Sequence, residues 1–495
     1  MSASSSLPLF HVVGFTGHRQ LRDPAVIDRA VQSALETLRK EGTGEWIALS
    51  SVAAGSDQLF AKRALSLGLA WQCVLPLPIA EFRKDFDPTE WKQVEALLPE
   101  AEQVRVIAEN GDREDAYLDA GLETVHTCDV LIAVWDGESA RGKGGTADVV
   151  AYARVLSKPL VVIDATTGAT RRENFERFRG RDAELDFLNT LKPSATPVDP
   201  AANVFDAPAI VADFQHTTDV AATQSAPHFR KLIASTVLLH VVATLVAAAA
   251  LAFDLHLLLL PWIKLICVVG ALLVALAIRH YRAQHNWVRC RLAAELGRSS
   301  LATWGLPRGS VLFEDLEFPE VRQLVRSLQT LHRRSAAAKP VGMEEFKARY
   351  LRHRVEDQLG YYRRQLTRAM PQLARLRTGF TTATLLAIAC TAAYAVDHTW
   401  HLGWFPKAGE QWLYYFLPIS LPVVAAAFMS LISINDLHRR VARYREMEHV
   451  LEGAAKQIAF SQTWNSLERV VRRTEHALLQ EVFEWHTLTS HLESH

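Results

Sequence analysis

The stretch DVLIAVWDGESARGKGGTADVV, residues 129–150, decides the fold of the first part of the chain. Its opening segment DVLIAVW is almost entirely apolar, which predicts a buried β-strand. A glycine-rich loop follows, and TADVV then begins a pattern typical of a helix. A strand that is apolar at nearly every position is buried on both faces, which is typical of a parallel sheet covered by helices.

The same alternation of strand and helix extends over residues 10–165. Helices are predicted at 23–42, with Asp23 as N-cap and Pro24 in the first turn, and at 56–68. Apolar runs predict strands at FHVVGF (10–15), WIALSS (46–51), WQCVLPL (71–77), QVRVIA (103–108), DVLIAVW (129–135) and PLVVID (159–164). We therefore expect residues 1–170 to form an α/β domain of Rossmann type with a doubly wound parallel sheet.

Composition separates this domain from the rest of the 495-residue chain, which has room for two to four domains. Up to Ala226 there are 22 Lys and Arg against 33 Asp and Glu, and from there on 32 against 21. The five cysteines form no CxxC pair, which argues against a disulfide framework or a zinc site. The N-terminus MSASSSLPLF lacks a basic region followed by an apolar core, so we expect no secretory signal and a cytoplasmic first domain.

The second half of the chain contains four long apolar segments. A helix is predicted at 172–191, and a segment rich in Pro, Ala and Thr then predicts mostly a linker, so residues 171–228 join the two halves. The apolar segments are Leu232–Phe253, Pro261–Ile278, Gly379–Val396 and Trp412–Ile434. Each is long enough to cross a hydrocarbon core of roughly 30 Å, which predicts four transmembrane helices. The alternative is a set of buried core helices in a large soluble protein.

Basic residues bracket both pairs of apolar segments, whereas the two intervening loops are poor in Lys and Arg. Tryptophans gather on the side of these loops, at Trp262, Trp400, Trp404 and Trp412. The basic residues are Arg230, Lys231, Arg279, Arg282, Arg375, Arg377, His438, Arg439, Arg440 and Arg443. By the positive-inside rule, both termini are expected in the cytoplasm, with the chain in the inner, cytoplasmic membrane. This role for the basic surplus is preferred to nucleic-acid binding, which we do not expect.

The spans form two pairs that look like a diverged duplication, at 229–310 and 311–495. Each pair is followed by basic residues, then a helix with a glutamate (Glu295, Glu452), then a tryptophan (Trp304, Trp464). The long polar helices beside the spans have apolar residues at helical spacing. We expect them to pack with each other or with copies in other subunits, so a homo-oligomer is expected.

Two loops at the predicted carboxyl ends of strands carry residues suited to a ligand. In GFTGHR the glycines Gly14 and Gly17 allow a close approach of the backbone, Thr16 and His18 offer hydrogen bonds, and Arg19 can hold a phosphate. The alternative is an ordinary turn with Arg19 in solvent. In SVAAGSD, Gly55 and Ser56 open a helix that Asp57 can cap, and capping alone accounts for Asp57.

The third loop follows the quoted strand and is the richest in glycine. Asp136 closes the strand, Lys143 adds a positive charge, and the remaining candidate ligand-binding residues are Gly142, Gly144, Gly145 and Thr146. Unobstructed amides at a helix N-terminus attract anions. The loop is neither a Walker A motif nor GxGxxG. Because three such loops share one sheet edge, they predict a nucleotide or sugar-phosphate site, with no metal and no resident cofactor.

The motifs GFTGHR, AAGSDQLFA, CDVLIAVWDG and GKGGTADVVAYAR resemble the SLOG superfamily, which includes LOG-type phosphoribohydrolases and DprA-like proteins. The resemblance covers residues 10 to about 165 and implies binding of a nucleotide-type ligand at this edge. One position departs from the hydrolase pattern GGxGTxxE: Val149 stands where the catalytic glutamate is expected. Asp148 lies one residue earlier, and a helix turns by about 100° per residue, so Asp148 would point elsewhere. The departure favours sensing over hydrolysis.

The segments RYLRHRVEDQLGYYRRQ and RVVRRTEHALLQEVFEW resemble SLATT domains, two-span modules associated with SLOG domains in bacterial conflict systems. The resemblance implies two such modules in a membrane effector that senses a nucleotide signal, of ADP-ribose or cyclic nucleotide type, and opens a pore in antiviral defence. Lys264, the one charged residue within the spans, lines a pathway or extends to the nearby interface. The alternatives are a membrane-tethered hydrolase of N-glycosidic bonds in NAD or nucleotides, using Asp57, Asp136 and Asp148, and a transporter or scaffold without a ligand.

Overall fold

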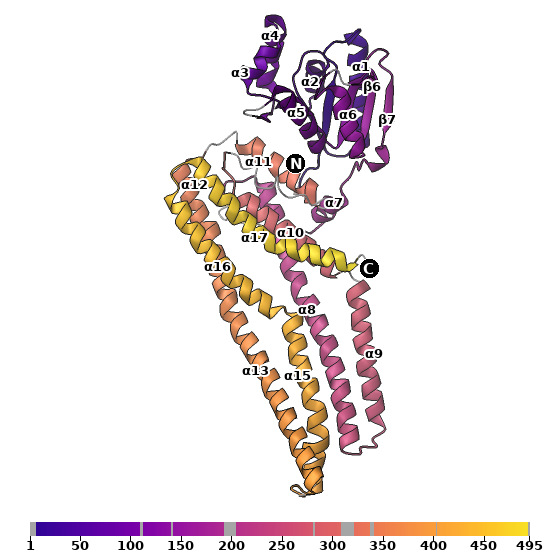
Figure 1. Cartoon of the computed structure of the whole chain (residues 1–495), viewed down its shortest axis with the longest axis vertical. Helices are drawn as coiled ribbons and strands as arrows, with labels where there is room; N and C mark the ends of the chain where they lie inside the picture. The colour runs from indigo at the N-terminus through magenta and orange to yellow at the C-terminus, as the bar shows by residue number, and fades with distance from the viewer. Residues whose placement is uncertain are drawn as a thin grey trace. The chain divides into compact units, whose positions relative to one another are not determined.

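The computed structural model describes residues 6–108, 112–139, 142–192, 204–280, 283–307, 321–336, 341–401 and 403–493. The chain divides into two compact units. The sheet unit comprises Ser6–Asn189 and Phe318–Ser327, and the helical unit comprises the remainder. Figure 1 shows the sheet unit in indigo to magenta and the long helices of the helical unit in pink to yellow.

The sheet unit is built on seven strands in the order β4-β3-β2-β1-β5-β6-β7. The strands are β1 (Phe10–Gly17), β2 (Glu45–Ser50), β3 (Ala70–Leu75), β4 (Gln103–Val106), β5 (Val130–Trp135), β6 (Leu160–Asp164) and β7 (Thr170–Glu173). All neighbours pair in parallel except β6 and β7. The six predicted strands and the mainly parallel sheet are therefore confirmed, with ends shifted by one to two residues.

The strand order reverses at β1, whose neighbours are β2 and β5. Side chains alternate along β1: Val13 and Phe15 join one core, and Phe10 and Val12 join the other. Helices α1 (Pro24–Glu41) and α2 (Ser56–Ser66) supply side chains to the first core, and α5 (Arg113–Thr127) and α6 (Thr146–Val155) to the second. Because helices cover both faces, every central strand is buried, which explains their continuous apolar sequence.

Two local predictions need correction. The predicted helix at 172–191 is α-helical only in α7 (Ala183–Asn189), because Thr170–Glu173 forms the antiparallel strand β7 and Phe175–Arg177 forms a single 3-10 turn. The residues of β7 have no apolar pattern, and their strand conformation comes from backbone pairing with β6. Residues 209–228, expected in the linker, are helical in α8 (Ala209–Ala252). By contrast, the predicted cap of α1 is confirmed: Asp23 accepts hydrogen bonds from Ala25 N and Val26 N.

The start of α11 (Arg322–Ala336) belongs to the sheet unit, and the helix from Leu328 on belongs to the helical unit. Arg326 forms an ion pair with the buried Asp129 and donates to Phe10 O at 3.2 Å. Burial alone would raise the pKa of Asp129, but Arg326 and the hydrogen bonds to His11 and Val12 lower it overall. This ion pair attaches the start of α11 to the N-terminal ends of β1 and β5. The ligand-type loops follow the opposite, carboxyl ends of these strands.

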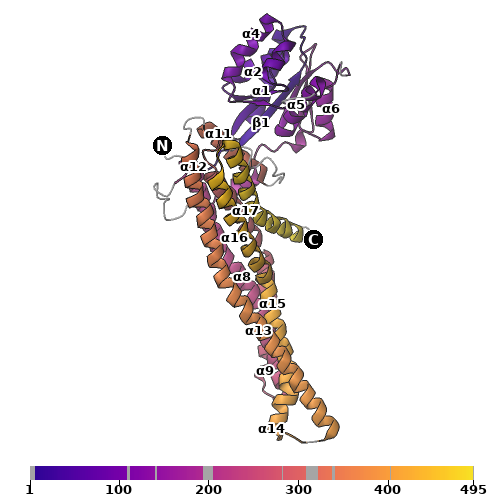
Figure 2. The ribbon, with the colours of Figure 1, turned by 60° about the vertical axis from the view of Figure 1, so that its left-hand side comes forward.

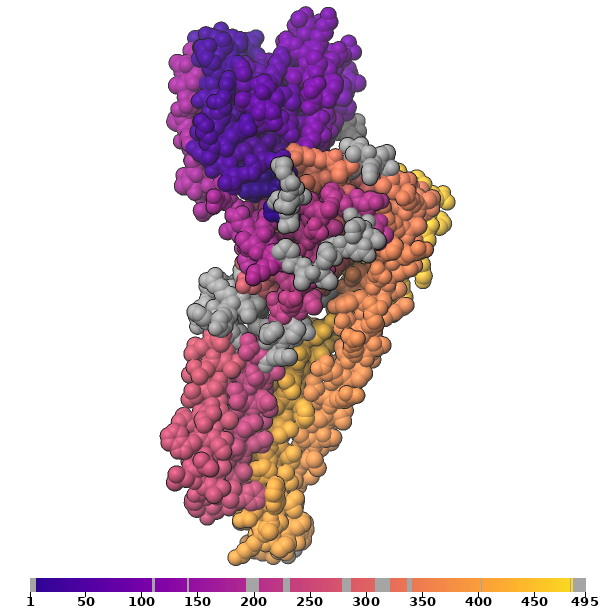
Figure 3. All heavy atoms as spheres, turned by 180° about the vertical axis from the view of Figure 1, so that it is seen from behind, coloured from indigo at the N-terminus to yellow at the C-terminus, as the bar shows by residue number. Residues whose placement is uncertain are grey.

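The helical unit consists of α8, α9 (Leu259–His280), α10 (Ala283–Ala302), α12 (Met343–Tyr350), α13 (Asp357–Trp400), α14 (Lys407–Glu410), α15 (Leu417–Ile434), α16 (Leu437–Phe460) and α17 (Trp464–Glu493), together with most of α11. Two six-residue π-helical turns, Leu351–Glu356 and Gln411–Phe416, lead into α13 and α15. Helix α8 packs with α9, α13 packs with α15, and α8 packs with α15 (Figures 2 and 3).

Four helices of this unit are long and apolar enough to cross a membrane, as the sequence predicts. Only 11–17 % of the residues in their most apolar windows are buried, and large side chains such as Leu258, Leu259 and Ile266 are exposed. Core helices of a soluble protein would bury these side chains, so the exposure favours membrane spans. Lys264 is exposed on α9. The side chains of Arg230, Lys231, Arg279 and Arg282 lie outside the described part of the chain.

A buried ion pair and two hydroxyl groups join α10, α12, α17 and the π-helical turn before α13. The Glu475 carboxylate of α17 accepts hydrogen bonds from Arg354 Nε at 2.9 Å and from its terminal nitrogen at 2.6 Å. It also accepts from Tyr350 Oη and Ser299 Oγ, each at 2.7 Å. Both ion-pair side chains are at most 2 % exposed. Arg354 lies in the π-helical turn before α13, so the pair fixes that turn against α17 and α10.

Candidate functional site

A cleft of the sheet unit lies where the strand order reverses, at the carboxyl ends of β1 and β5. Its volume is about 1290 Å³. Open α/β sheets bind ligands at this position because the loops diverge there and leave a crevice. Of the predicted ligand-binding residues, the structure brings eleven together around it: Thr16, Gly17, His18, Arg19, Asp57, Asp136, Gly142, Lys143, Gly144, Gly145 and Thr146.

Three further predicted residues, Gly14, Gly55 and Ser56, are placed outside the cleft lining and hold the loops together. A Cβ at Gly14 would lie 2.8 Å from the Cys128 side chain, so Gly14 lets α5 approach β1. Gly55 has φ +87, and a Cβ there would lie 2.0 Å from Arg19 O. The Ser56 hydroxyl is fully buried and donates to His18 O at 2.8 Å. These residues fix the β1 loop against α2.

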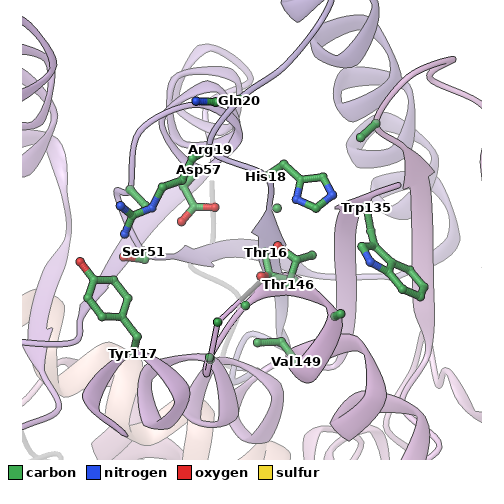
Figure 4. Close-up of a pocket in the computed structure, with 18 of the residues that line it drawn as sticks. Thr16, His18, Arg19, Gln20, Ser51, Asp57, Tyr117, Trp135, Thr146 and Val149 are labelled. Carbon is green, nitrogen blue, oxygen red and sulfur yellow. The ribbon is translucent and has the colours of Figure 1, made fainter. Parts of the chain in front are cut away.

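Asp57, in the first turn of α2, points toward the cleft beside Arg19 (Figure 4). Its side chain is buried, and Oδ1 has no hydrogen-bond partner. Burial raises the pKa of Asp57 to about 7, although the Arg19 charge and a hydrogen bond from Ala53 act in the other direction. A buried carboxyl group with a free oxygen is a strong candidate for contact with a polar ligand group.

Residues of α5 and its surroundings complete this side of the cleft. The Arg19 guanidinium lies 5.4 Å from the centre of the Tyr117 ring. Tyr117 Oη donates to Asp85 Oδ2 at 2.5 Å, and Arg113 also binds Asp85. Burial and the hydrogen bond to Asp85 raise the pKa of Tyr117, so the phenol remains protonated. Sequence reasoning missed Tyr117, Arg113 and Asp85, because only the packing of α5 and of the 3-10 turn Arg83–Asp85 brings them to the cleft.

His18 and the Trp135 ring lie on the opposite side of the cleft (Figure 4). Asp136 lies close to His18. His18 Nε2 accepts a hydrogen bond from Asp136 N at 3.1 Å and lies 3.1 Å from Asp136 Oδ1. Desolvation alone would raise the pKa of Asp136, but the hydrogen bond from Glu138 N and the neighbouring His18 lower it overall. Asp136 is therefore a carboxylate at neutral pH.

The glycine-rich loop ends at the N-terminus of α6, which faces the cleft through Thr146 and Ala147. The N-cap is Gly145, which has no side chain to satisfy the first N–H groups of the helix. Such a terminus attracts an anion. Gly144 has φ +80, and a Cβ there would lie 2.6 Å from Leu118 N, so this glycine lets the loop pack on α5. Lys143 pairs with Asp115 at the surface.

Two residues of α6 bear on hydrolysis. Asp148 Oδ2 accepts a hydrogen bond from Gly144 N at 2.9 Å, and Asp148 is absent from the described cleft lining. Val149 is buried, and a Cβ on Gly121 would lie 2.5 Å from Val149 Cγ2. An apolar side chain therefore stands where the hydrolase pattern GGxGTxxE has glutamate. Among the residues that the structure describes, no three His, Cys, Asp or Glu side chains are grouped to hold a metal ion.

One protein family matches the part of the chain that contains the third and fourth apolar segments. Residues 350–485 match SMODS and SLOG-associating 2TM effector domain 1. The matched SLATT_1 segment contains α13, α15, α16 and both members of the Arg354–Glu475 pair. It does not extend to the sheet unit or to α8 and α9. No curated protein matches the chain. The SLATT part of the sequence-based prediction is thus confirmed for the second module, and the match suggests a membrane effector.

Proposed function

We propose that the chain is a ligand-gated membrane effector of bacterial antiviral defence. In this proposal the sheet unit, as a SLOG-like domain of Rossmann type, binds a nucleotide-type signal of ADP-ribose or cyclic nucleotide class. The transmembrane helices then form a pore or otherwise disrupt the membrane. The observation that carries the proposal is a cleft with an uncapped helix N-terminus and a buried polar group, in a chain that also contains the SLATT_1 match.

The cleft offers distinct partners to each part of a nucleotide. The N-terminus of α6 suits a phosphate group, and the exposed Arg19 adds positive charge near it. The free Oδ1 of Asp57 suits a ribose hydroxyl, and the Tyr117 and Trp135 rings suit a base. Among the residues that the structure describes, Oδ1 of Asp57 has no hydrogen-bond partner and the N-terminus of α6 has no side-chain cap.

Gating requires that the ligand bind one state of the protein more tightly than another. We further propose that the chain forms a homo-oligomer in the inner membrane, with both termini in the cytoplasm. In this proposal each chain contributes two SLATT-type modules, 229–310 and 311–495. Lys264 on α9 is the candidate for a charged pathway residue. The exposed apolar faces of the spans provide surface for lipid or for neighbouring subunits.

The first test uses the full chain purified in detergent. Small molecules are extracted from it and identified by mass spectrometry, and the identified compound is added to dye-filled liposomes that contain the chain. We expect dye release only with the ligand. Arg19→Gln should abolish ligand-dependent release, whereas Arg29→Gln, which removes an exposed arginine outside the cleft lining, should retain it. A compound that binds the cleft without causing any release would contradict the proposal.

A second function is favoured by Asp57 alone. A carboxyl group with a pKa of about 7 beside a cleft has the properties of a general acid, as needed to cleave an N-glycosidic bond in NAD or a nucleotide. Asp136 and Asp148 fit this role less well, since Asp136 is ionised and Asp148 is bonded to the loop. Incubation of the full chain with NAD and nucleoside monophosphates tests this: turnover lost in Asp57→Asn but kept in Asp148→Asn would establish hydrolysis through Asp57.

A further inference from the structure

A groove of about 670 Å³ lies between α13 and α16 of the helical unit. Three basic side chains and three threonines line it: Arg377, Thr378, Thr381 and Thr382 on α13, and His438 and Arg445 on α16. The α13 residues recur at i, i+1, i+4 and i+5, and the α16 residues are one seven-residue repeat apart, so each set occupies one helix face. The two faces meet where α13 packs with α16.

The groove lies at one end of the apolar spans. Arg377 immediately precedes the span that begins near Gly379, and His438 follows the span that ends near Ile434. The exposed Trp400 and Trp412 mark the other end of the same two spans. At 1.5 Å per residue, Arg377 and Trp400 are about 35 Å apart along α13, close to the thickness of a bilayer core with part of its headgroup layer. The groove therefore lies at headgroup depth.

The groove has an excess of positive charge. Arg377 and Arg445 are exposed, and no carboxylate is among the described residues that line it. The glutamates of α16 near this region are engaged elsewhere: Glu446 pairs with Arg443, while Glu448 and Glu452 pair with Arg363. The Arg445 guanidinium contacts the Met370 sulfur at 3.6 Å. Two guanidinium groups without acidic partners favour a phosphate, which accepts paired hydrogen bonds from arginine.

An apolar surface continues from the groove into the span. Leu385 and Leu386 lie one helical turn beyond Thr381 and Thr382, and their side chains are 59 % and 55 % exposed. A soluble phosphate compound gains nothing from these side chains, whereas acyl chains would lie along them. Leu373 and Val441 line the groove on the side away from the span.

We propose that this groove binds the headgroup phosphate of an anionic phospholipid, with Arg377 and Arg445 as phosphate ligands and Leu385 and Leu386 against the acyl chains. The Thr381 and Thr382 hydroxyls donate to the backbone carbonyls of Arg377 and Thr378, so they add no charge to the groove. Basic pockets between transmembrane helices on the cytoplasmic side recognise anionic lipid headgroups by the same chemistry. The site is separate from the cleft of the sheet unit, so it stands whether or not that cleft binds a nucleotide.

Native mass spectrometry of the full chain in detergent tests the proposal. Phosphatidylglycerol and phosphatidylcholine are titrated separately, and bound lipids are counted. We expect the wild type to bind phosphatidylglycerol more tightly, and Arg377→Gln with Arg445→Gln to weaken that binding about 100-fold, since losing each charge-assisted hydrogen bond to the phosphate costs about a factor of ten. Equal retention of the two lipids by the wild type would overturn the proposal.

The matched control is Arg375→Gln with Arg439→Gln, which removes the same charge from the same helices. Both residues are exposed and lie outside the described groove lining. We expect this variant to bind phosphatidylglycerol like the wild type, and equal loss in both double variants would show general surface charge instead of a site. Glycerol 3-phosphate is added as a soluble competitor. Displacement of the lipid by this compound at equal concentration would show a free-phosphate site and overturn the assignment to a lipid.

Discussion

The side chain of Asp148 accepts a hydrogen bond from the backbone N–H of Gly144, at 2.9 Å. The carboxylate thereby closes the glycine-rich loop onto the first turn of α6 instead of facing the cleft. The two residues are four apart in sequence, and Gly144 has a positive φ that turns its N–H toward the helix. Because this bond holds the Asp148 carboxylate against the loop, the carboxylate does not occupy the anion position that we propose at Thr146.

Replacing Asp148 with alanine should loosen the loop. The lost bond is equivalent to a helix-capping interaction, so we expect a local loss of about 1 kcal/mol and roughly fivefold faster hydrogen exchange over residues 142–149 of the full chain. The control is Asp115→Ala, which removes only an exposed partner of Lys143 and should change exchange little. Equal acceleration in both variants would show that the Asp148 bond is not what orders the loop.

The raised pKa of Asp57 predicts a pH-dependent stability. The folded protein keeps its proton up to about pH 7, whereas the unfolded chain releases it near 3.8. The folded state therefore binds more protons between about pH 4 and pH 7, and the free energy of unfolding falls as pH rises through that range, by up to about 4 kcal/mol. Asp57→Asn should remove this loss, so the variant should be more stable than the wild type above pH 7.

Hydrogen exchange of α2 in the full chain, corrected for the intrinsic exchange rate, measures this effect between pH 5 and pH 8. The control is Asp119→Asn, an exposed carboxylate of α5 that should keep the wild-type pH dependence. A wild-type α2 whose protection does not change with pH would contradict the burial of a neutral Asp57.

The Arg354–Glu475 pair should be essential for the fold of the helical unit. Glu475→Ala leaves the Arg354 guanidinium buried without its charge partner, which costs about 3–5 kcal/mol. We expect this variant to lose the single peak of the wild type in size-exclusion chromatography in detergent. Combining Arg354→Met with Glu475→Leu removes both charges and should recover much of the lost stability. If the double variant does not recover stability, the loss in Glu475→Ala comes instead from the hydrogen bonds that Tyr350 and Ser299 donate to Glu475.

Two glycines on transmembrane and juxtamembrane helices should respond oppositely to alanine. A Cβ at Gly379 of α13 would lie 2.9 Å from the Phe428 ring, whereas a Cβ at Gly453 of α16 has open space. Gly379→Ala should lower the melting temperature, because overpacking costs about 1–3 kcal/mol. Gly453→Ala should raise it, because alanine favours the helix by about 1 kcal/mol. Stabilisation by both substitutions would show that α13 and α15 are not closely packed at Gly379.

The sequence by itself determined the elements whose burial is continuous along the chain. Uniformly apolar strands such as Val130–Trp135 predict the parallel sheet, and long uncharged segments predict the membrane helices. Both patterns show directly which residues are removed from water. It also placed most of the cleft residues, since loops after neighbouring parallel strands share one edge. The exposed strand β7 carries no such pattern and was missed.

Only the tertiary structure decided which distant side chains meet. Tyr117 reaches Arg19 because α5 packs over β1, and Glu475 reaches Arg354 because α17 returns to the start of α13. Asp148 and Val149 are neighbours in sequence, yet one closes the loop while the other is buried against Gly121. Local sequence encodes which residues avoid water, but the partner of a polar group depends on the path of the backbone between the two residues, which is fixed only when the elements pack.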